Sequence, residues 1–495
     1  MTGRSTQRNL EQHVDAFPTV TERGAVVLKT RDGMIFAAAG IALIACQAWL
    51  VVATRGLTHS NGAQLAAVLP LILGLAVPTG LLLVAAPRIV SIPVSRAAMI
   101  VLLAVGALMR LVWFGTPPPL EDDFFRYLWD GAVVAHGLDP YAYAPAEFTG
   151  QNQTPAAYAR IADGAQATLR GINFPEMRTI YPSVAQAAFA LAHLIAPFKV
   201  DGLRLVFFAG ELVTLWLLVE MLGRLGQSPL WSLLYWWNPL VAFMLVGIAH
   251  VDALIPPFVL GAVLALSAGG SFTALALIGL GAGVKVWPVL LSALVLWPLL
   301  RTPMRLAQAS LWLAVVLAFA VGPVLVSALR PGSGLSAYAG GWSNNNAPFA
   351  WLLYAFYSVS GSVETAERTL RPMLAIATGV IALVMAARGD ATLNSLASRA
   401  LVVAAAMFYL SPAQFPWYAV WFLPLAVLCR SWPLLMASAL LPTYYLFFPL
   451  WPVWNGVWFF YGTAFMHSVP VLCGLVYVWY RAKMNANQPE KAAQR

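Results

Sequence analysis

The chain has 495 residues, of which 60% are hydrophobic and 10% charged, and its net charge is +9. Soluble domains carry about 25% charged residues, so this composition excludes a soluble globular protein and predicts an all-α polytopic membrane protein. The basic residues are scattered over the polar segments, as the positive-inside rule describes. They give no reason to expect nucleic acid as a partner.

The N-terminal part of the chain predicts a cytoplasmic tail, residues 1–32, followed by three membrane spans. The tail is polar and lacks the apolar core of a secretory signal peptide. A spanning helix needs roughly twenty apolar residues, and the runs that satisfy this are Met34–Ala53, Leu65–Ala86 and Ala97–Phe114. Because the basic tail is expected inside, the third span delivers the chain to the far side of the membrane.

The longest polar stretch, residues 115–182, is predicted to be a periplasmic loop that carries amphipathic juxtamembrane helices. It contains more acidic than basic residues, which favours the exterior side. It opens with Glu121, Asp122 and Asp123, and a surface helix is predicted from Asp123 to His136. Carboxylates beside a membrane are costly and usually serve a function.

The acidic cluster has two interpretations that do not exclude each other. Asp122 could cap the following helix. Alternatively, Asp122 or Asp123 serves as a general base, since two adjacent carboxylates repel and one then holds a raised pKa. Asp130 lies two helical turns after Asp123 on the same face, where we expect it to support the site or to pair with Arg126.

The remaining chain predicts a continuous integral-membrane domain over residues 33–480, with about 13–14 spans in total. Ser183–Phe198 is apolar but short and is interpreted as re-entrant, because this choice brings later basic residues to the cytoplasmic side. Residues 481–495 are expected to form a second cytoplasmic tail. Glu211, deep in a span, is expected to pair across helices. The spans expected after the loop are Leu203–Leu222, Leu230–Gly247, Leu254–Ser267, Phe272–Val284 and Trp287–Leu300, with four or five more behind them.

Polar, broken segments gather at the outer ends of these spans. They are "TIYPS" from Thr179, "AHVD" from Ala249, "VKVWP" from Val284, "GGWSNNNAPFAW" from Gly340 and "SPAQFPWY" from Ser411. Irregular backbone at membrane depth is tolerated only where it lines a cavity. We therefore expect one shared cavity on this face.

Four side chains in or near these segments are candidates for phosphate recognition. Lys285 interrupts an apolar run and must either snorkel to the interface or serve as a counter-charge. His250 and Asp252 either tie two helices together or contact phosphate and sugar hydroxyls, and Arg178 is a second cationic candidate. A divalent metal at the acidic cluster is the less favoured alternative, because no familiar ligand spacing is present, and no cofactor is expected.

Two segments carry a resemblance to a known family. "EDDFFRYLWDGAVVAHGLDPYAYAP" from Glu121 and "INFPEMRTIYPSVAQ" from Ile172 resemble bacterial polytopic glycosyltransferases of the GT-C superfamily. Within it, they resemble the polyprenyl-phosphate-mannose-dependent mannosyltransferases of glycosyltransferase family 87, the DUF2029-like proteins. The order of "NPL", "AHVD" and "VKVWP" is also similar to the eukaryotic mannosyltransferase that builds the glycosylphosphatidylinositol anchor. The resemblance extends from about Pro117 to Pro298.

The resemblance implies a GT-C fold and an inverting transfer of a sugar, with mannose favoured. The donor would be a polyprenyl-phosphate sugar and the acceptor a lipid or glycan, at the periplasmic face of the bacterial inner membrane. Asp122 or Asp123 would act as the base. A lipid-linked-sugar flippase and a glycan ligase are the alternatives. The residues expected around the substrates and the phosphate are Lys285, His250, Asp252, Arg178, Tyr181, Glu121, Arg126 and Asp130.

Overall fold

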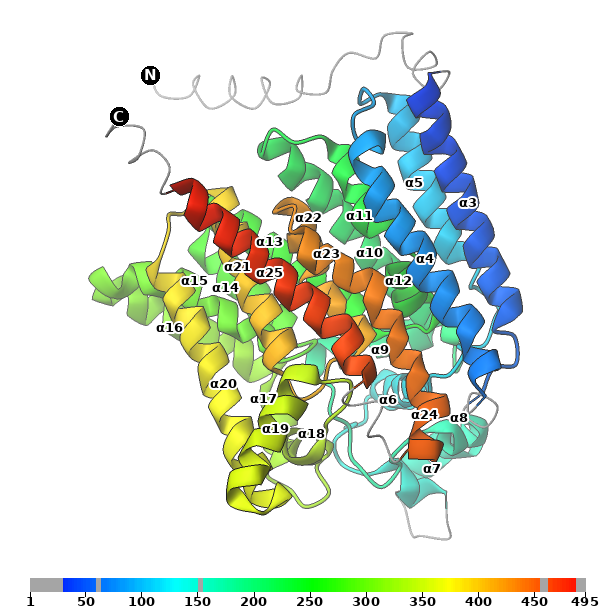
Figure 1. Cartoon of the computed structure of the whole chain (residues 1–495). Helices are drawn as coiled ribbons and strands as arrows, with labels where there is room; N and C mark the ends of the chain where they lie inside the picture. Colours follow the sequence, from blue (N-terminus) through cyan, green and yellow to red (C-terminus); the bar gives the residue numbers. More distant parts are fainter. Residues whose placement is uncertain (1–29, 59–63, 150–154, 455–461, 487–495) are drawn as a thin grey trace, which may run out of the picture.

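The structure is a computed structural model that describes residues 30–58, 64–149, 155–454 and 462–486. Over these residues the protein is built from helices, and the only extended pairing is an isolated bridge between Asn344 and Ala413. The prediction of an all-α polytopic membrane protein is confirmed (Figure 1). Most of the predicted N-terminal tail, residues 1–29, lies outside the described residues.

Seven helices of the described chain are long and apolar enough to cross a membrane. They are α3 (Arg31–Ala53), α4 (Leu65–Ile89), α10 (Val200–Arg224), α16 (Pro303–Ala320), α20 (Val363–Ala387), α21 (Leu393–Leu410) and the run Trp432–Leu450. An eighth is added if the pair Pro229–Trp236 and Pro239–Gly247, bent by 56°, forms one broken span. By length, this count is lower than the predicted 13–14 or so, because several apolar runs fold into shorter or interrupted helices.

The other helices of the bundle are short, except α25, which continues to Ala486 and so extends into the predicted C-terminal tail. The α-helices are α5 (Arg96–Leu111), α9 (Ser183–Ile195), α11 (Leu233–Trp236), α12 (Pro239–Ala242), α13 (Ile255–Ser267), α14 (Ser271–Ala282), α15 (Ser292–Leu296), α17 (Gly322–Ala328), α18 (Gly334–Gly341), α19 (Ala347–Ser360), α22 (Leu423–Leu428), α23 (Trp432–Leu440), α24 (Phe447–Trp454) and α25 (Ala464–Ala486). The 3-10 and π turns are η2 (Pro229–Ser232), η3 (Phe243–Gly247), η4 (Val251–Leu254), η5 (Trp287–Leu291), η6 (Trp297–Arg301), η7 (Pro416–Trp421) and η8 (Leu441–Leu446). Proline stands in the first turn of many of them, where its missing N–H costs nothing.

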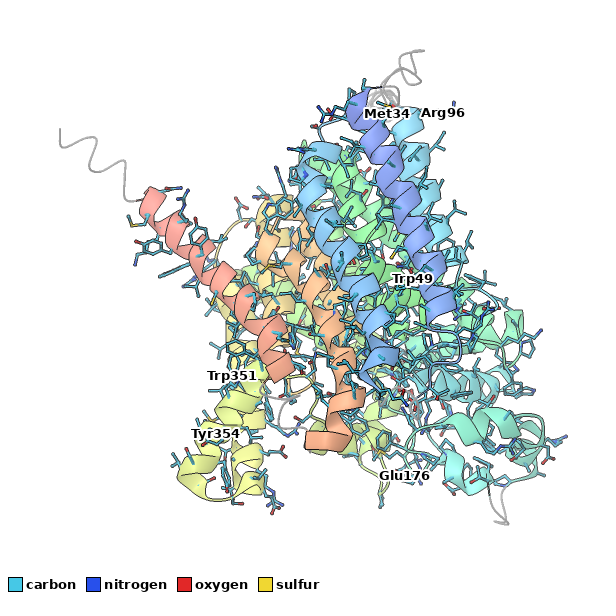
Figure 2. The ribbon with its side chains drawn as sticks, turned by 45° about the vertical axis from the view of Figure 1, so that its right-hand side comes forward. Met34, Trp49, Arg96, Glu176, Trp351 and Tyr354 are labelled. Atoms are coloured by element: carbon cyan, nitrogen blue, oxygen red, sulfur yellow. The ribbon has the colours of Figure 1, made fainter. Side chains whose placement is uncertain are left out.

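The two ends of the bundle differ. Met34 and Arg96 lie at one end, whereas Glu176 lies at the opposite end (Figure 2). The predicted loop, residues 115–182, gathers at this second end (Figure 1). Its helices are α6 (Asp123–Ala135), η1 (Pro145–Phe148), α7 (Ala156–Gly164) and α8 (Gln166–Gly171).

The loop has a small hydrophobic core of its own. Trp129 and Val133 of α6 pack with Phe148, Tyr158 and Leu169 from the rest of the loop. The prediction that α6 is a surface helix is therefore wrong, since most of its residues are buried. The reason is tertiary: α8 and α9 pack against the helix and cover it.

The segment interpreted as re-entrant is a single helix, α9, of 13 residues. At 1.5 Å per residue it reaches about 20 Å, less than a membrane span requires. Just inside its start, the Val184 amide donates to the Gly283 carbonyl. Past its end, Asp201 accepts a hydrogen bond from the Gly115 amide at 3.0 Å, where the loop begins. The helix thus packs along α6, and both its flanks contact the loop end of the bundle; that the segment is re-entrant stays a prediction.

A fully buried ion pair joins α5 to α10 inside the helix bundle. Arg110 of α5 and Glu211 of α10 are both fully buried, and Arg110 Nε lies 2.9 Å from Glu211 Oε2. Arg110 also donates to the backbone oxygens of Gly106 and Trp236. The expectation that Glu211 pairs across helices is confirmed, and the pair fastens α5 to α10 without exposing either charge.

Candidate active site

A cavity of about 590 Å³ opens between the loop and the broken ends of the bundle helices. Each of the outer-face segments named from the sequence except "AHVD" contributes several residues to its wall, and "AHVD" contributes His250. The expectation that these segments share one cavity is confirmed, and the cavity lies at the end of the bundle that holds the loop. Of the residues proposed from the sequence, those in the wall are Glu121, Asp122, Asp123, Arg126, Arg178, Tyr181, His250 and Lys285.

The acidic cluster stands where the loop turns into α6. Asp122 occupies the N-cap position, but its side chain makes no capping hydrogen bond. Instead, Asp122 Oδ1 accepts a hydrogen bond from Asn173 Nδ2 at 2.6 Å, and the same amide nitrogen donates to Asp123 Oδ1 at 3.1 Å. The capping role expected for the Asp122 side chain is therefore absent, and its carboxylate is directed to the cavity.

His250 links the acidic cluster to Lys285. His250 Nε2 lies 3.3 Å from Asp123 Oδ2, and His250 Nδ1 lies 2.7 Å from Asp252 Oδ2. Asp252 in turn accepts hydrogen bonds from Lys285 Nζ at 2.8 Å and from Trp421 Nε1 at 2.6 Å. Four residues singled out from the sequence thus form one continuous chain of contacts, with Asp252 fully buried behind the cavity wall.

Breaks in the helices place this chain of contacts. The π turn η3 ends at Gly247, and Ala249 has a φ of 57°, so the backbone leaves the helical path before His250. Lys285 lies between α14 and η5, which has a proline in its first turn. Such π turns and proline breaks are frequent at functional sites, because they aim side chains that a regular helix would bury.

The three carboxylates differ in proton affinity. Burial, and then repulsion from Asp123, raises the pKa of Asp122 to about 7. Burial, with the charges of Asp123 and Asp122, raises the pKa of Glu121 well above its usual value. Burial alone would also raise the pKa of Asp123, but the hydrogen bond and charge of His250 outweigh it and hold that pKa below its usual value. Asp123 is therefore the ionised member of the cluster, whereas Asp122 exchanges its proton near neutral pH.

Aromatic rings surround the cationic part of the cavity. Lys285 Nζ lies 3.8 Å from the centre of the Tyr418 ring, and Trp417 stacks on His250 with ring centres 4.4 Å apart. Trp287 Nε1 is buried in this wall and has no hydrogen-bond partner among the described residues. The cavity therefore offers a bound molecule flat apolar faces together with an indole donor.

The two loop arginines at the cavity, Arg126 and Arg178, hold backbone rather than pointing freely into it. Arg126 donates to the carbonyl oxygens of Phe174 and Met177, both at 3.0 Å. Arg178 donates through Nη1 to the carbonyl oxygen of Pro331 at 2.7 Å. Both side chains line the cavity, so each contributes charge from a fixed position while fastening the loop.

Tyr181 and Asp130 join α6 to α9 next to the cavity. The Tyr181 hydroxyl donates to the Tyr127 hydroxyl at 3.3 Å. Asp130 is buried, and its carboxylate accepts a hydrogen bond from Gln186 of α9 at 3.1 Å. Asp130 thus lies behind the cavity wall, where it hydrogen-bonds to Gln186 and interacts with Arg126 through charge.

In the part of the chain that the structure describes, no group of three or more histidine, cysteine, aspartate or glutamate side chains is arranged to hold a metal ion. The nearest candidates are engaged with one another, since His250 faces two carboxylates and Asp252 binds Lys285.

Three contacts of the site were not anticipated from the sequence. Asn173 bridges the two aspartates, Trp421 donates to Asp252, and the Tyr445 hydroxyl donates to Glu121 at 3.4 Å. Trp421 lies in the same short 3-10 helix, η7, as Tyr418. The aromatic residues of that segment could therefore have pointed to Trp421. Asn173 and Tyr445 carried no signal of their own, because each reaches the site through the fold.

The comparisons with known proteins concern one part of the chain. Residues 178–301, about a quarter of the sequence, match the model of a family described as alpha-(1→6)-mannopyranosyltransferase, N-terminal domain. No curated protein and no solved structure matches the chain. The matched segment includes Arg178, Tyr181, His250, Asp252 and Lys285, and it ends at η6. Together with the membrane-spanning helices, the match supports a membrane mannosyltransferase of the GT-C type.

Proposed function

We propose that the protein transfers mannose from a polyprenyl-phosphate donor to a hydroxyl group of a lipid or glycan acceptor, with inversion at the anomeric carbon. The reaction would take place at the periplasmic face of a bacterial inner membrane. One observation carries the proposal: a carboxylate pair from the loop and a lysine from the break between α14 and η5 open on the same aromatic-walled cavity. A sugar phosphate on a lipid carrier needs this combination of a base, a cation and an apolar surround.

Asp122 is the better of the two candidate bases. Its pKa of about 7 matches the pH at which a base must accept and release protons. Asp123 is tied to His250 and has a lowered pKa, so its affinity for a proton is weaker. In the proposed step, the acceptor oxygen bonds to the anomeric carbon, the bond from that carbon to the phosphate oxygen breaks, and Asp122 takes the hydroxyl proton.

The leaving phosphate requires positive charge rather than a proton. Lys285 supplies this charge in the cavity wall. Its Nζ is held by Asp252 and faces the Tyr418 ring, at the end of the chain of contacts farthest from Asp123. His250 sits between Lys285 and Asp123, and Arg178 adds its charge from the loop. Fixed groups of this kind stabilise developing charge without reorganising during the reaction.

The test is transfer from radiolabelled polyprenyl-phosphate mannose by purified protein. We expect Asp122→Asn to lower the rate by about 100-fold or more, the range typical for a general base, and Asp123→Asn to have a smaller effect. Asp163→Asn, on the exposed side of α7, is the matched control and should keep full activity. Full turnover by Asp122→Asn would remove the catalytic assignment. Movement of the lipid-linked sugar across proteoliposomes without any glycosidic product would favour the flippase alternative.

A further inference from the structure

One side chain touches both aspartates of the cluster. The Nδ2 group of Asn173 donates one hydrogen bond to Asp122 Oδ1 and another to Asp123 Oδ1, at 2.6 and 3.1 Å. An amide nitrogen carries two hydrogens, which is the number that two carboxylates side by side can share. Two adjacent carboxylates otherwise repel each other, so this bridge sets their common orientation.

The backbone that carries Asn173 is itself fastened. Phe174, the next residue, has a φ of 47°, a left-handed conformation that is costly for a residue with a large side chain. Buried Arg126 holds the turn by donating to the Phe174 and Met177 carbonyl oxygens. The Phe174 ring packs edge-on against Trp342, with ring centres 4.6 Å apart. The strained turn is thus anchored from α6 and from the far wall of the cavity.

We propose that Asn173 is a positioning residue of the reaction, whose amide holds the Asp122 and Asp123 carboxylates in the orientation that the acceptor hydroxyl meets. This inference rests on the proposed function. It assigns Arg126 the task of fixing the turn that brings Asn173 to the cluster. The strain at Phe174 then has a reason, because a relaxed turn would withdraw the amide.

The surroundings of Asp122 determine in which direction its pKa moves when the Asn173 bridge is removed. The bridge from Asn173 stabilises the ionised form of Asp122, against the burial and the negative charge of Asp123 that raise its pKa. Removing the bridge therefore makes Asp122 harder to ionise. The other titratable or charged groups that act on the cluster are Glu121 on the same segment, Arg126 and Tyr127 of α6, His250, Lys285, Tyr181 and Tyr338 around Asp123, and Tyr444 and Tyr445 of η8.

The first experiment is the pH dependence of transfer by Asn173→Ala and by Asn173→Asp. For Asn173→Ala we expect kcat to fall by about tenfold or more, the donor KM to stay near that of the wild type, and the acidic limb to move up by about one pH unit. Asn173→Asp keeps the shape of the side chain but replaces the donor with a third carboxylate at the bridge. Its acidic limb should move further up. Asn344→Ala, which removes an amide from the same cavity where it faces Tyr444, should leave the limb in place.

A second measurement separates this proposal from the proposed function. With ¹³C-labelled aspartate, the infrared difference between the wild type and Asp122→Asn isolates the Asp122 carboxyl, and its titration needs no substrate. We expect the titration to move to higher pH in Asn173→Ala and in Asn173→Asp, even if the protein is not a transferase. Thermal unfolding of the same samples shows whether the loop remains folded.

Two results would overturn the inference. One is an unchanged Asp122 titration in both Asn173 variants while the loop stays folded. The other is a loss of activity that appears only as a raised donor KM, with the acidic limb where the wild type has it. If the wild type transfers no mannose but the Asp122 titration still shifts in the Asn173 variants, the proposed function is contradicted and the role of Asn173 in orienting the two carboxylates is supported.

Discussion

Asp122 and Asp123 are chemically identical neighbours, and their surroundings give them different tasks. Asp123 faces His250 and stays ionised, whereas Asp122 is buried beside that charge and titrates near neutral pH. Separation of two carboxylates by environment is a common way to obtain one base and one electrostatic support. Here the difference comes from a residue that lies 127 positions away in the sequence.

The raised pKa of Asp122 predicts the pH profile of transfer. A general base works only when ionised, so kcat/KM should rise with pH, bend near 7 and level off above it. The check is the rate of transfer between about pH 5 and 9 at fixed ionic strength. Asp163→Asn should show the same profile. A profile that falls as pH rises through 7 would contradict a base at this position.

The Lys285–Asp252 pair predicts that substitutions affect the stability of the protein and its binding of the donor in different ways. Lys285→Gln leaves the fully buried Asp252 carboxylate without its ammonium partner, which we expect to destabilise the protein by about 3 kcal/mol. Adding Asp252→Asn removes the orphaned charge and should recover most of that loss, while the donor KM stays raised. Thermal unfolding in detergent and donor titrations measure the two effects. Recovery of both in the double variant would show that Lys285 has only a structural role.

Most of these residues were accessible to reasoning from the sequence. Asp122, His250 and Lys285 stand out because charge is rare in this chain and each sits beside a helix break. Asn173 could not be found that way, since an asparagine in a polar loop is ordinary. Its contact with the aspartates depends on the left-handed turn at Phe174 and on Arg126, neither of which leaves a pattern in the sequence.

At the scale of elements, the site depends on how closely α6 packs on α9. Gly131 of α6 faces the backbone of Phe189, and a Cβ at that position would lie 2.3 Å from the Phe189 carbonyl oxygen. The absence of a side chain lets the two helices touch. This contact sets the position of the α6 N-terminus, and with it the position of the acidic cluster.

Gly131→Ala should therefore lower both stability and activity. Alanine normally favours a helix over glycine by about 1 kcal/mol, but here the clash with a backbone atom should outweigh it and give a net loss of about 1–3 kcal/mol. Gly164→Ala at the end of α7, where the added methyl group meets open space, is the control and should not lose stability. Thermal unfolding of the wild type and of both variants in detergent measures these changes in stability. Equal melting temperatures would contradict the close packing.

The elements also show what local sequence patterns miss. Four of the five broken segments named from the sequence contain a proline, whose ring blocks a continuous helix. The amphipathic pattern of α6 predicted a surface helix, yet α8 and α9 cover it. Its polar residues Arg126 and Asp130 are buried with hydrogen-bond partners in the loop and in α9, and such partnerships are invisible in hydropathy.

For the whole molecule, the decisive property is that the broken segments named from the sequence meet around one cavity, at the end of the bundle where the loop lies. Glu176 and the loop lie at this end, and Met34 and Arg96 at the other (Figure 2). Hydropathy predicted this arrangement well, since it follows from where the apolar runs stop. It overestimated the number of long helices, because runs such as Trp287–Arg301 divide into short turns instead of crossing as one rod.

This arrangement predicts opposite labelling of two surface positions. In a variant whose native cysteines are replaced by alanine, Glu176→Cys should react with a membrane-impermeant maleimide added to intact spheroplasts, and Arg96→Cys should not. Both side chains are exposed in the structure, so burial does not explain a difference. Arg96→Cys should react after the membrane is permeabilised. Labelling of both positions from the same side would refute the orientation. The native cysteines to be replaced are Cys46, Cys429 and Cys473.

The Arg110–Glu211 pair has a consequence for how the protein inserts into the membrane during its synthesis. Arg110 leaves the ribosome 101 residues ahead of Glu211, a lead of roughly 5–20 s at ordinary rates of synthesis. A guanidinium at the centre of a membrane helix costs about 3 kcal/mol on insertion scales, but Arg110 stands in the last turn of α5 and can reach the lipid headgroups until its counter-ion arrives. Burial of this charge therefore couples the packing of α5 against α10 to completion of the loop between them.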